Sequence, residues 1–292
     1  MPVVVERTAA MPPVRWTLWD GGRLRINEAF ADLLRTAGLE SFAAGAVLDG
    51  GEIVRAVGPR VTRRIMLGDG AARRSFFLKR HAPVRLGERV KPWLRLSSGV
   101  FGARPEWEAL LKFHAAGLPT MTPVACGEAG EHSWLLTEGL ESPQNLLDWT
   151  RELASRSHSY SSGVAAEWDS DERLRIYLIE LAKIARRMHD AGLHHQDFYL
   201  NHVLLCETAT GNPELRVIDL GRVREQQPLS QRWILKDLSQ LNYSARHLTC
   251  RTRLRFLRQY LGRPFCDSDR RLIWWLEQKA AQIARHTDKH RL

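Results

Sequence analysis

Two carboxylates flank a hairpin pattern in the second half of the chain. Asp197 lies just before the apolar run Val203–Cys206, and Asp219 directly follows the run Leu215–Ile218. The turn-rich segment 208–213 separates the two runs, as is typical of a β-hairpin. Antiparallel pairing brings the start of one strand near the end of the other, so we expect both acids at one end of the hairpin. Two acids placed in this way suit a general base and a metal ligand.

A lysine lies much earlier in the chain, at the end of an aromatic and apolar run, Phe76–Lys79. This run closes three short segments, 52–57, 60–67 and 75–79, which predict an antiparallel meander. The order of meander, lysine and two acids resembles that of the protein-kinase fold. In such a fold Lys79 would grip the α and β phosphates of ATP, Asp219 would bind Mg²⁺, and Asp197 would accept the proton of the acceptor hydroxyl.

A helix and a hinge are needed to position this lysine and the nucleotide. The segment 105–116 predicts a helix with Pro105 in its first turn, and either Glu106 or Glu108 could pair with Lys79. We favour Glu106, which opens the run EWEALL, although a glutamate early in a helix is often only a solvated partner of the helix dipole. Strands at 124–127 and 133–137 then lead into the run WLLTEGL. There we expect the hinge, with the backbone of Glu138 to Leu140 meeting the adenine.

A glycine-rich lid over the phosphates is the weakest part of this interpretation. Gly50, Gly51 and Gly58 form no GxGxxG motif and could simply be turn residues. Arginines on the following strand could supply phosphate donors instead, although a solvated strand face is an equally good interpretation. These arginines are Arg60, Arg63 and Arg64.

The remaining pattern is mainly helical. We expect residues 1–20 to be irregular, a helix over 27–37, a loop over 45–51, and a loop or insertion over 151–171. The clearest helix is 172–190, because apolar residues recur there every three or four positions. Further helices are expected after residue 230 and over 252–261 and 268–284. The last carries Trp274 and Trp275, which could face a membrane, but packing into the core is the favoured interpretation.

These elements predict an α+β fold of the two-lobed protein-kinase type. An antiparallel, strand-rich N-lobe would precede a mainly helical C-lobe. The expected divisions are an N-terminal extension with one helix, 1–44, an N-lobe with the hinge, 45–140, and a C-lobe with a basic tail, 141–292.

Composition narrows the class of protein. The 292 residues are 44% hydrophobic and carry a formal net charge of +10. This charge favours acidic partners such as nucleic acid, anionic lipid or phosphorylated ligands, although it could also indicate only a solvated basic surface. Four widely spaced cysteines predict neither a zinc site nor a disulfide framework. We expect no signal peptide and no membrane span. No nucleic-acid-binding motif accompanies the charge, so no nucleic-acid partner is predicted.

Several runs of the sequence carry a closer resemblance to a known family. These runs are FFLKRH at 76–81, ARPEWEAL at 103–110, AGLPTMTPVACGE at 116–128, LLTEGL at 135–140, HHQDFYLNHVLL at 194–205, VIDLGRVR at 217–224 and KDLSQLNYSA at 236–245. Through them the chain resembles the lipopolysaccharide kinase family, the Kdo/WaaP group, over about residues 45–262, and within it the core heptose kinases.

The resemblance implies a cytoplasmic, ATP- and Mg²⁺-dependent enzyme that phosphorylates heptose of the lipopolysaccharide inner core, or another phosphorylated glycolipid, at the inner membrane. Peripheral contact with anionic lipid would accompany this location. The resemblance also implies Asp197 as the catalytic base, Asp219 as a metal ligand, and Lys79 with Glu106 as the phosphate-positioning pair.

Two positions depart from ordinary protein kinases. Gln196 stands where ordinary protein kinases have the arginine whose charge pairs with a phosphorylated activation loop. His202 stands at the position of the asparagine that binds the second metal ion, and Asn201 is one residue before that position. Imidazole is a poor Mg²⁺ ligand, but the heptose-kinase motif also carries His there, so His202 is retained as a candidate metal ligand. Three alternatives stay open: a kinase of another small molecule or protein, an inactive nucleotide-binding pseudokinase, and a metallohydrolase built on the histidines.

Overall fold

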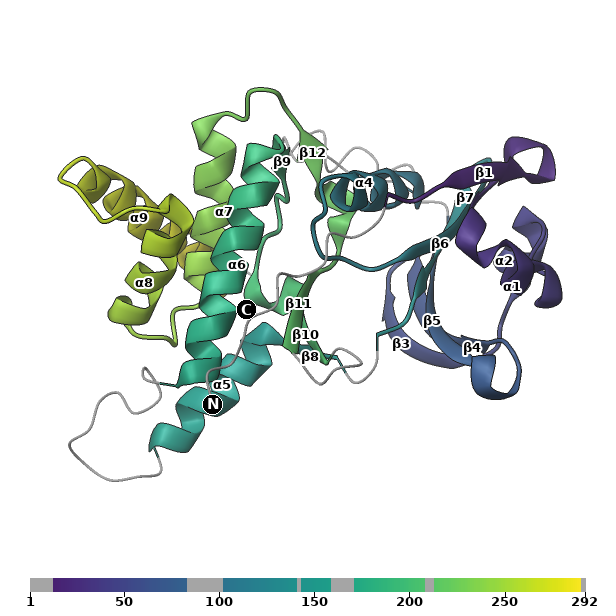
Figure 1. Ribbon diagram of the computed structural model, residues 1–292, viewed down its shortest axis with the longest axis horizontal. Helices are drawn as coiled ribbons and strands as arrows, with labels where there is room; N and C mark the ends of the chain where they lie inside the picture. Colours follow the sequence, from purple (N-terminus) through teal and green to yellow (C-terminus); the bar gives the residue numbers. More distant parts are fainter. Residues whose placement is uncertain (1–12, 83–101, 141–142, 159–170, 208–212, 290–292) are drawn as a thin grey trace. The chain divides into compact units, whose positions relative to one another are not determined.

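The computed structural model describes residues 13–82, 102–140, 143–158, 171–207 and 213–289 (Figure 1). The chain divides into two compact units. Unit 1 contains residues 1–141 together with Asp219–Val223, and unit 2 contains Ser142–Ile218 together with Arg224–Leu292. The short segment that carries Asp219 therefore leaves the helical unit and joins the sheet-rich one.

Unit 1 is built on a seven-stranded sheet in the order β1-β2-β6-β7-β5-β4-β3, in which every neighbouring pair is antiparallel. Buried residues alternate along β4 and β5, as in a strand with one face on the core, whereas β6 and β7 are buried over five consecutive residues. Leu24, Phe76 and Trp134 belong to this core. The strands are β1 (Trp16–Trp19), β2 (Leu24–Asn27), β3 (Glu52–Val57), β4 (Arg60–Leu67), β5 (Arg74–His81), β6 (Pro123–Ala129) and β7 (His132–Glu138).

Helices cover this sheet or flank it: α1 (Ala31–Thr36), α2 (Phe42–Val47) and α4 (Arg104–Ala115). The indole Nε1 of Trp134 donates a hydrogen bond to the carbonyl of Phe42 at 3.0 Å, which ties α2 to the sheet. Two glycines make room for this indole, because a Cβ at Gly45 or Gly127 would collide with it. The absence of a side chain is therefore a packing requirement at both positions.

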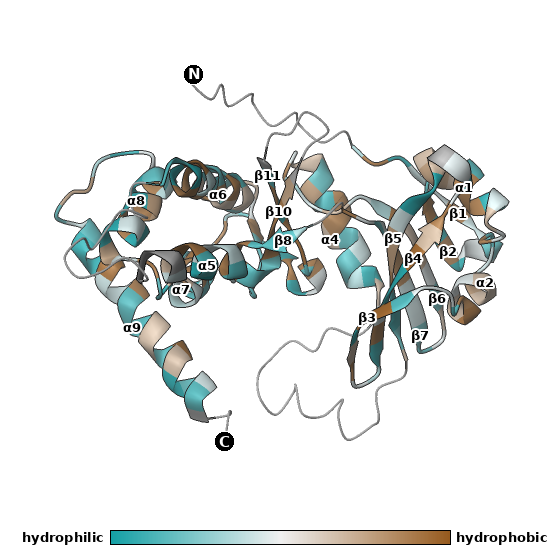
Figure 2. Cartoon of the chain, turned by 90° about the horizontal axis from the view of Figure 1, so that it is seen from below, coloured by the Kyte–Doolittle hydropathy of each residue, from teal (hydrophilic) through white to brown (hydrophobic). Residues whose placement is uncertain are grey.

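Unit 2 is mainly helical, and apolar residues (brown) follow one side of α6 in Figure 2. Its helices are α5 (Leu146–His158), α6 (Glu172–Asp190), α7 (Gln231–Ser244), α8 (Cys250–Leu261) and α9 (Asp269–Lys289). The predicted hairpin is present: β10 (Val203–Glu207) pairs with β11 (Pro213–Val217), and Val203 lies opposite Val217. β8 (Gln144–Asn145) adds a third strand, and β9 (Leu193–His194) pairs with β12 (Arg224–Glu225).

Three local predictions are wrong. Residues 16–19, expected to be irregular, form β1, and the 45–51 loop begins inside α2. The expected loop 151–171 starts as helix, because α5 continues to His158. In each case the element is short or has a weak apolar period, and tertiary packing decides its conformation.

The aromatic pair of α9 also departs from the favoured interpretation. Trp274 is 53% exposed and Trp275 is 38% exposed, whereas Leu276, Ala280 and Ala284 of the same helix are buried. The expectation that both tryptophans pack into the core is therefore wrong. Within the part of the chain that the structure describes, no helix is both long and apolar enough to cross a membrane.

Candidate active site

The ammonium group of Lys79 lies between two acids in unit 1. Its Nζ contacts Glu106 Oε1 at 2.9 Å and Oε2 at 2.7 Å, and Asp219 Oδ1 lies 3.7 Å away. The three side chains come from β5, from the first turn of α4, and from the start of the 3₁₀ turn Leu220–Arg222. Burial alone would lower the pKa of Lys79, but the charges of Glu106 and Asp219 outweigh it and raise that pKa. The lysine is therefore held charged at one face of the sheet.

The choice between the two glutamates of α4 is clear in the structure. Glu108, which faces the other way, pairs with Arg104 at 2.7 Å on the exposed side of the helix. Only the position-106 carboxylate reaches Lys79, because residues two apart on a helix lie on nearly opposite faces. Pro105 lies at the start of α4, where its missing N–H costs no helical hydrogen bond.

Asp219 has a left-handed backbone conformation, with φ of 59°. Aspartate tolerates this region better than most residues that carry a Cβ. The conformation begins the turn Leu220–Arg222, whose Leu220 and Gly221 are buried. This turn packs against α4, so Asp219 and Glu106 approach Lys79 from neighbouring elements.

His81 follows Lys79 by two residues on β5 and therefore lies on the same face of the sheet. It is buried, and among the described residues its Nε2 has no hydrogen-bond partner. Burial first, and then the charges of Arg60 and Lys79, lower the pKa of His81 to about 3. This imidazole is neutral and was not predicted as a site residue, although it lies in the FFLKRH motif.

The end of β7 forms the segment predicted as the hinge. Glu138 donates its backbone N–H to the carbonyl of Thr122 at 2.9 Å, and its side chain binds Arg74 at 2.7 Å. Gly139 donates its N–H to the carbonyl of Ser75 at 2.7 Å, and a Cβ on Gly139 would collide with Ser75. The amides of residues 138 and 139 are thus engaged inside unit 1, and Leu140 follows them.

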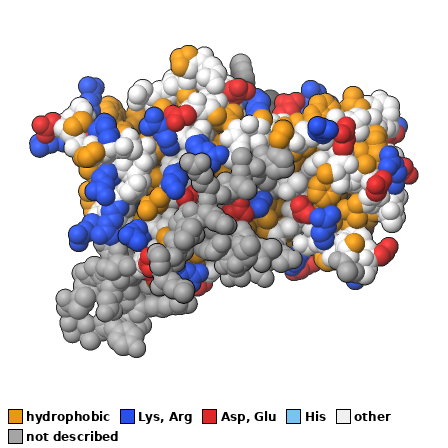
Figure 3. All heavy atoms as spheres, viewed as in Figure 1, with side chains coloured by type: hydrophobic (Ala, Val, Ile, Leu, Met, Phe, Trp, Pro, Cys, Tyr) orange, Lys and Arg blue, Asp and Glu red, His pale blue; other side chains and the backbone are white. Residues whose placement is uncertain are grey.

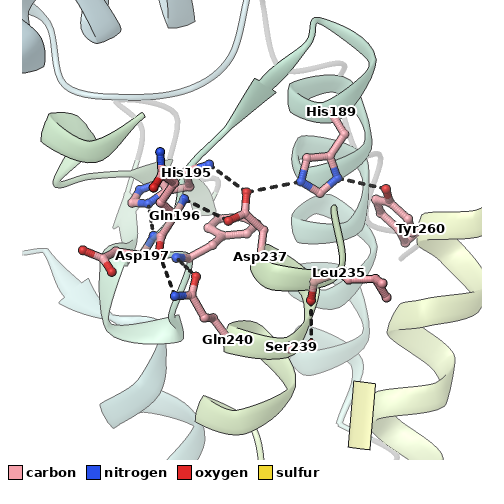
Figure 4. A network of polar contacts seen from close by, with 10 residues as sticks. His189, His195, Gln196, Asp197, Leu235, Asp237, Ser239, Gln240 and Tyr260 are labelled. Atoms are coloured by element: carbon pink, nitrogen blue, oxygen red, sulfur yellow. Dashed lines mark hydrogen bonds and ion pairs between the residues drawn. The ribbon is translucent and has the colours of Figure 1, made fainter. Parts of the chain in front are cut away.

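Asp197 lies in unit 2, on a loop between β9 and the 3₁₀ turn Leu200–His202. Four backbone N–H groups of this loop and of the turn after it are bound by side chains of α7. Figure 4 shows two of these side chains, Asp237 and Gln240, beside the loop. Asp237 accepts from His195 at 2.7 Å and from Gln196 at 2.9 Å. Gln240 accepts from Phe198 at 2.9 Å and donates to the carbonyl of Gln196 at 2.7 Å, and Ser244 accepts from Leu200 at 3.0 Å.

These three α7 residues are spaced by three and four positions, so they lie on one face of the helix. Asp237 is completely buried, and its Oδ2 also lies 3.4 Å from His189 Nε2. The Nδ1 atom of His189 meets the hydroxyl of Tyr260, 2.9 Å away on α8 (Figure 4). The sequence carries a partial signal for these contacts, because the spacing of Asp237, Gln240 and Ser244 in the run KDLSQLNYSA predicts a polar face on one helix, although not the loop that it binds.

Two histidines link the loop to the hairpin. The Nε2 of His195 lies 3.0 Å from the carbonyl of Ile218, and the Nδ1 of His202 lies 2.8 Å from the carbonyl of Asp197. A carbonyl can only accept, so these two ring nitrogens carry protons. Ile218 in turn donates its N–H to the carbonyl of His202 at 2.9 Å. His202 therefore has a clear role in holding the Asp197 backbone, whereas its role as a metal ligand stays a prediction.

The structure thus brings Lys79, Glu106 and Asp219 together in one unit, and Asp197 and His202 together in the other. The sequence matches the Lipopolysaccharide kinase (Kdo/WaaP) family over residues 53–260, which is more than half of the chain. The chain belongs to this family. The predicted family and class of enzyme, a phosphotransferase with an alcohol acceptor, are confirmed, and membership of a kinase family implies the use of ATP.

Two relatives match this sequence over 89% of the chain. The lipopolysaccharide core heptose(I) kinase WaaP of Pseudomonas aeruginosa is 34% identical over 275 residues, which cover 89% of this chain and 96% of the relative. The protein of the same name from Escherichia coli K12 is 32% identical over 272 residues, covering 89% and 94%.

A solved structure, described as WaaP in complex with acyl carrier protein, is 31% identical to this chain. It covers 89% of this chain and 98% of that one, with a TM-score of 0.63. The predicted two-lobed, kinase-like α+β fold is confirmed by this match.

The Lys79 contact predicts a contrast between two neighbouring glutamates. Glu106→Gln removes one negative charge beside the ammonium group, so we expect kcat/KM for ATP to fall about tenfold or more. Glu108→Gln is the matched control, because its carboxylate pairs with exposed Arg104. Steady-state kinetics on the two purified variants measure the difference, and equal values would contradict the role of Glu106.

The burial of Asp237 predicts a loss of stability when its carboxylate is changed. Asp237→Asn replaces one of two accepting oxygens by an NH₂ donor, which leaves a backbone N–H of residue 195 or 196 without an acceptor. We expect the free energy of unfolding to fall by about 1–3 kcal/mol. Asp267→Asn, at a side chain that is 93% exposed, is the matched control and should leave the free energy of unfolding unchanged. Urea unfolding followed by circular dichroism measures the effect, and a wild-type midpoint for Asp237→Asn would refute it.

Proposed function

We propose that the protein is an ATP-dependent kinase that phosphorylates a sugar hydroxyl, that of heptose, in the lipopolysaccharide inner core. The observation that carries this proposal is Lys79 held between Glu106 and Asp219 in a chain of the lipopolysaccharide kinase family. A charged lysine fixed by two acids is a ready partner for nucleotide phosphates. The relatives named as heptose(I) kinases support heptose as this sugar.

In the proposed mechanism, unit 1 acts as the nucleotide lobe. Lys79 binds the α and β phosphates, and Glu106 keeps its ammonium group in place. Because the amides of Glu138 and Gly139 are engaged within the unit, the backbone after them, at Leu140, is the better donor to adenine. The carbonyl of Glu138 is the second hinge contact that we propose.

The donor set fits Mg²⁺ at one position. Asp219 supplies a half-exposed carboxylate, 39% accessible, and Mg²⁺ is commonly held by one or two carboxylates together with substrate phosphates. When bound, the ion would neutralise charge on the phosphates. His202 offers a ring nitrogen, which suits Mg²⁺ poorly, so we propose Asp219 as the principal ligand and retain His202 only as the candidate for a second ion.

Asp197 is the proposed base in unit 2. Its backbone is fixed from both sides, since His202 donates to its carbonyl and His195 Nδ1 accepts from its N–H at 3.3 Å. The acceptor hydroxyl would pass its proton to the Asp197 carboxylate as the γ-phosphoryl group is transferred in line. Little covalent chemistry is required, so orientation is the main contribution of this loop.

This base predicts the outcome of a direct assay. The purified wild-type protein should transfer phosphate from Mg-ATP to dephosphorylated core lipopolysaccharide, and Asp197→Asn should lower kcat by about 100-fold or more. Asp190→Asn, in an exposed pair with Arg186, is the matched control and should behave as wild type. Mass spectrometry of the product locates the phosphate.

Other results of this assay favour the alternatives. Transfer to a different small molecule or protein, but not to the core sugar, would keep the kinase and change its substrate. ATP binding without phosphate transfer by the wild type or any variant would instead favour a pseudokinase. The observation that favours this alternative is His202 at the position of the second metal ligand.

We propose acyl carrier protein as a second partner, because the solved relative is WaaP in complex with acyl carrier protein. Unit 2 offers an apolar cavity of about 330 Å³ lined mainly by leucines of α6, α7 and α8, together with residues of α5 and α9. A cavity of this size and lining suits the apolar chain that such a carrier bears. Its lining includes Leu178, Leu181, Leu241, Ala245 and Leu257.

The cavity predicts that the acyl chain contributes to the affinity for this carrier. We expect the acyl-loaded carrier to bind about tenfold more tightly than the unloaded carrier, because burying a few methylene groups suffices for such a difference. Ala245→Phe would fill part of the cavity and remove that difference without changing the affinity for the unloaded carrier. Calorimetric titration measures both affinities, and an unchanged preference in the variant would contradict the assignment.

A further inference from the structure

The helix α9 presents one long face that combines tryptophan with arginine. Positions 271, 274, 275, 278, 282 and 285 recur at three- and four-residue intervals, so they lie on one side of the helix. All six side chains are exposed, and none is acidic. We call them the outer face of α9: Arg271, Trp274, Trp275, Gln278, Gln282 and Arg285.

The opposite face of α9 is occupied by the fold. Leu276, Ala280 and Ala284 are buried, and α9 packs against α7. Glu277 is bound by Arg253 of α8 at 2.6 Å and by Asn242 of α7 at 3.2 Å. This acid is therefore engaged by neighbouring helices, and the orientation of α9 about its own axis is fixed.

The start of α9 is fixed as well. Asp269 accepts the backbone N–H of Cys266 at 2.8 Å and forms a two-pronged ion pair with Arg263, at 2.7 and 2.8 Å. This contact orders the segment that carries Phe265, a third exposed aromatic residue. The rings of Trp274 and Trp275 are in edge-to-face contact, 4.8 Å apart, so the apolar group is preformed.

Positive charge is concentrated in the part of the chain that contains α8 and α9. Between residues 250 and 289 there are ten Lys and Arg against four Asp and Glu, which accounts for 6 of the formal net charge of +10 of the whole chain. Figure 3 shows Lys and Arg side chains gathered, with apolar side chains among them, over the region of α8 and α9 labelled in Figure 1. A basic surface that also exposes large apolar side chains is the usual signature of attachment to anionic membranes.

We propose that the outer face of α9 is a docking surface for an anionic lipid bilayer, with Trp274 and Trp275 inserted at the level of the headgroups. Tryptophan favours this interface because its ring is apolar and its N–H is polar. Arg271 and Arg285 flank the pair and would meet lipid phosphates. The proposal deepens the proposed function and rests on it for one point, that a lipopolysaccharide substrate is presented at a membrane.

The test uses the full chain and vesicles of phosphatidylcholine with or without phosphatidylglycerol. The wild type should sediment with the anionic vesicles only. The double variant Trp274→Ala/Trp275→Ala, and separately the variant Arg271→Glu/Arg285→Glu, should bind them about tenfold more weakly or worse. The matched control is Trp16→Ala, because Trp16 is also an exposed tryptophan (43%) but lies on β1 of unit 1; this variant should bind as the wild type does.

Several outcomes overturn the proposal. Equal sedimentation of the wild type and the tryptophan variant does so directly. Light scattering that shows a dimer lost in this variant would make the face a contact between two copies, and weaker binding of acyl carrier protein with unchanged vesicle binding would make it a carrier surface. Vesicle binding needs no turnover, so Asp197→Asn should still bind. A wild-type protein that binds vesicles but has no kinase activity would contradict only the proposed function. A wild-type protein that is active but does not bind vesicles would contradict only the proposed docking surface.

Discussion

The arrangement of unit 2 depends on one buried carboxylate. Asp237 has no exposed surface, and a charge in this position is tolerated only when hydrogen bonds replace the water that it has lost. The backbone N–H groups of His195 and Gln196 supply them, at 2.7 and 2.9 Å. The same bonds fix the two residues that precede Asp197. One set of hydrogen bonds therefore both stabilises the buried carboxylate and orients the backbone that carries the proposed base.

Unit 1 uses charge in a different way. Lys79 is only partly exposed, and it remains charged because Glu106 and Asp219 compensate for burial. His81, on the same strand face, is neutral because the charges of Arg60 and Lys79 add to its desolvation, and the opposing effect of Asp219 is smaller. The two neighbours show that burial alone does not decide protonation. The partner charges within a few ångström decide it.

The parts of the fold that were predictable share a strong local signal. The hairpin, the helix 172–190 and the order of Lys79, Glu106, Asp197 and Asp219 were all read from apolar period, turn residues and motif. β1 and α2 were not, because elements of four to six residues carry little periodic information and are stabilised by the sheet beside them. The exposure of Trp274 and Trp275 could not be predicted either, since the period of a helix identifies a face but not what covers it. The contacts from α7 to the Asp197 loop join residues about 42 positions apart, so the sequence could indicate a polar helix face at Asp237, Gln240 and Ser244 but not the loop that this face binds.

The loop that carries Asp197 is held through its main chain. Both polar backbone groups of Gln196 are engaged, its N–H by Asp237 and its carbonyl by Gln240, and neither bond depends on which side chain residue 196 carries. An arginine at this position in ordinary protein kinases serves control by phosphorylation, and its loss here leaves the scaffold intact. An exchange at position 196 would therefore keep both bonds, provided that the new side chain fits a buried position with φ of 68°. The residues of α7 that bind the loop have no such freedom, because their own side chains make the contacts.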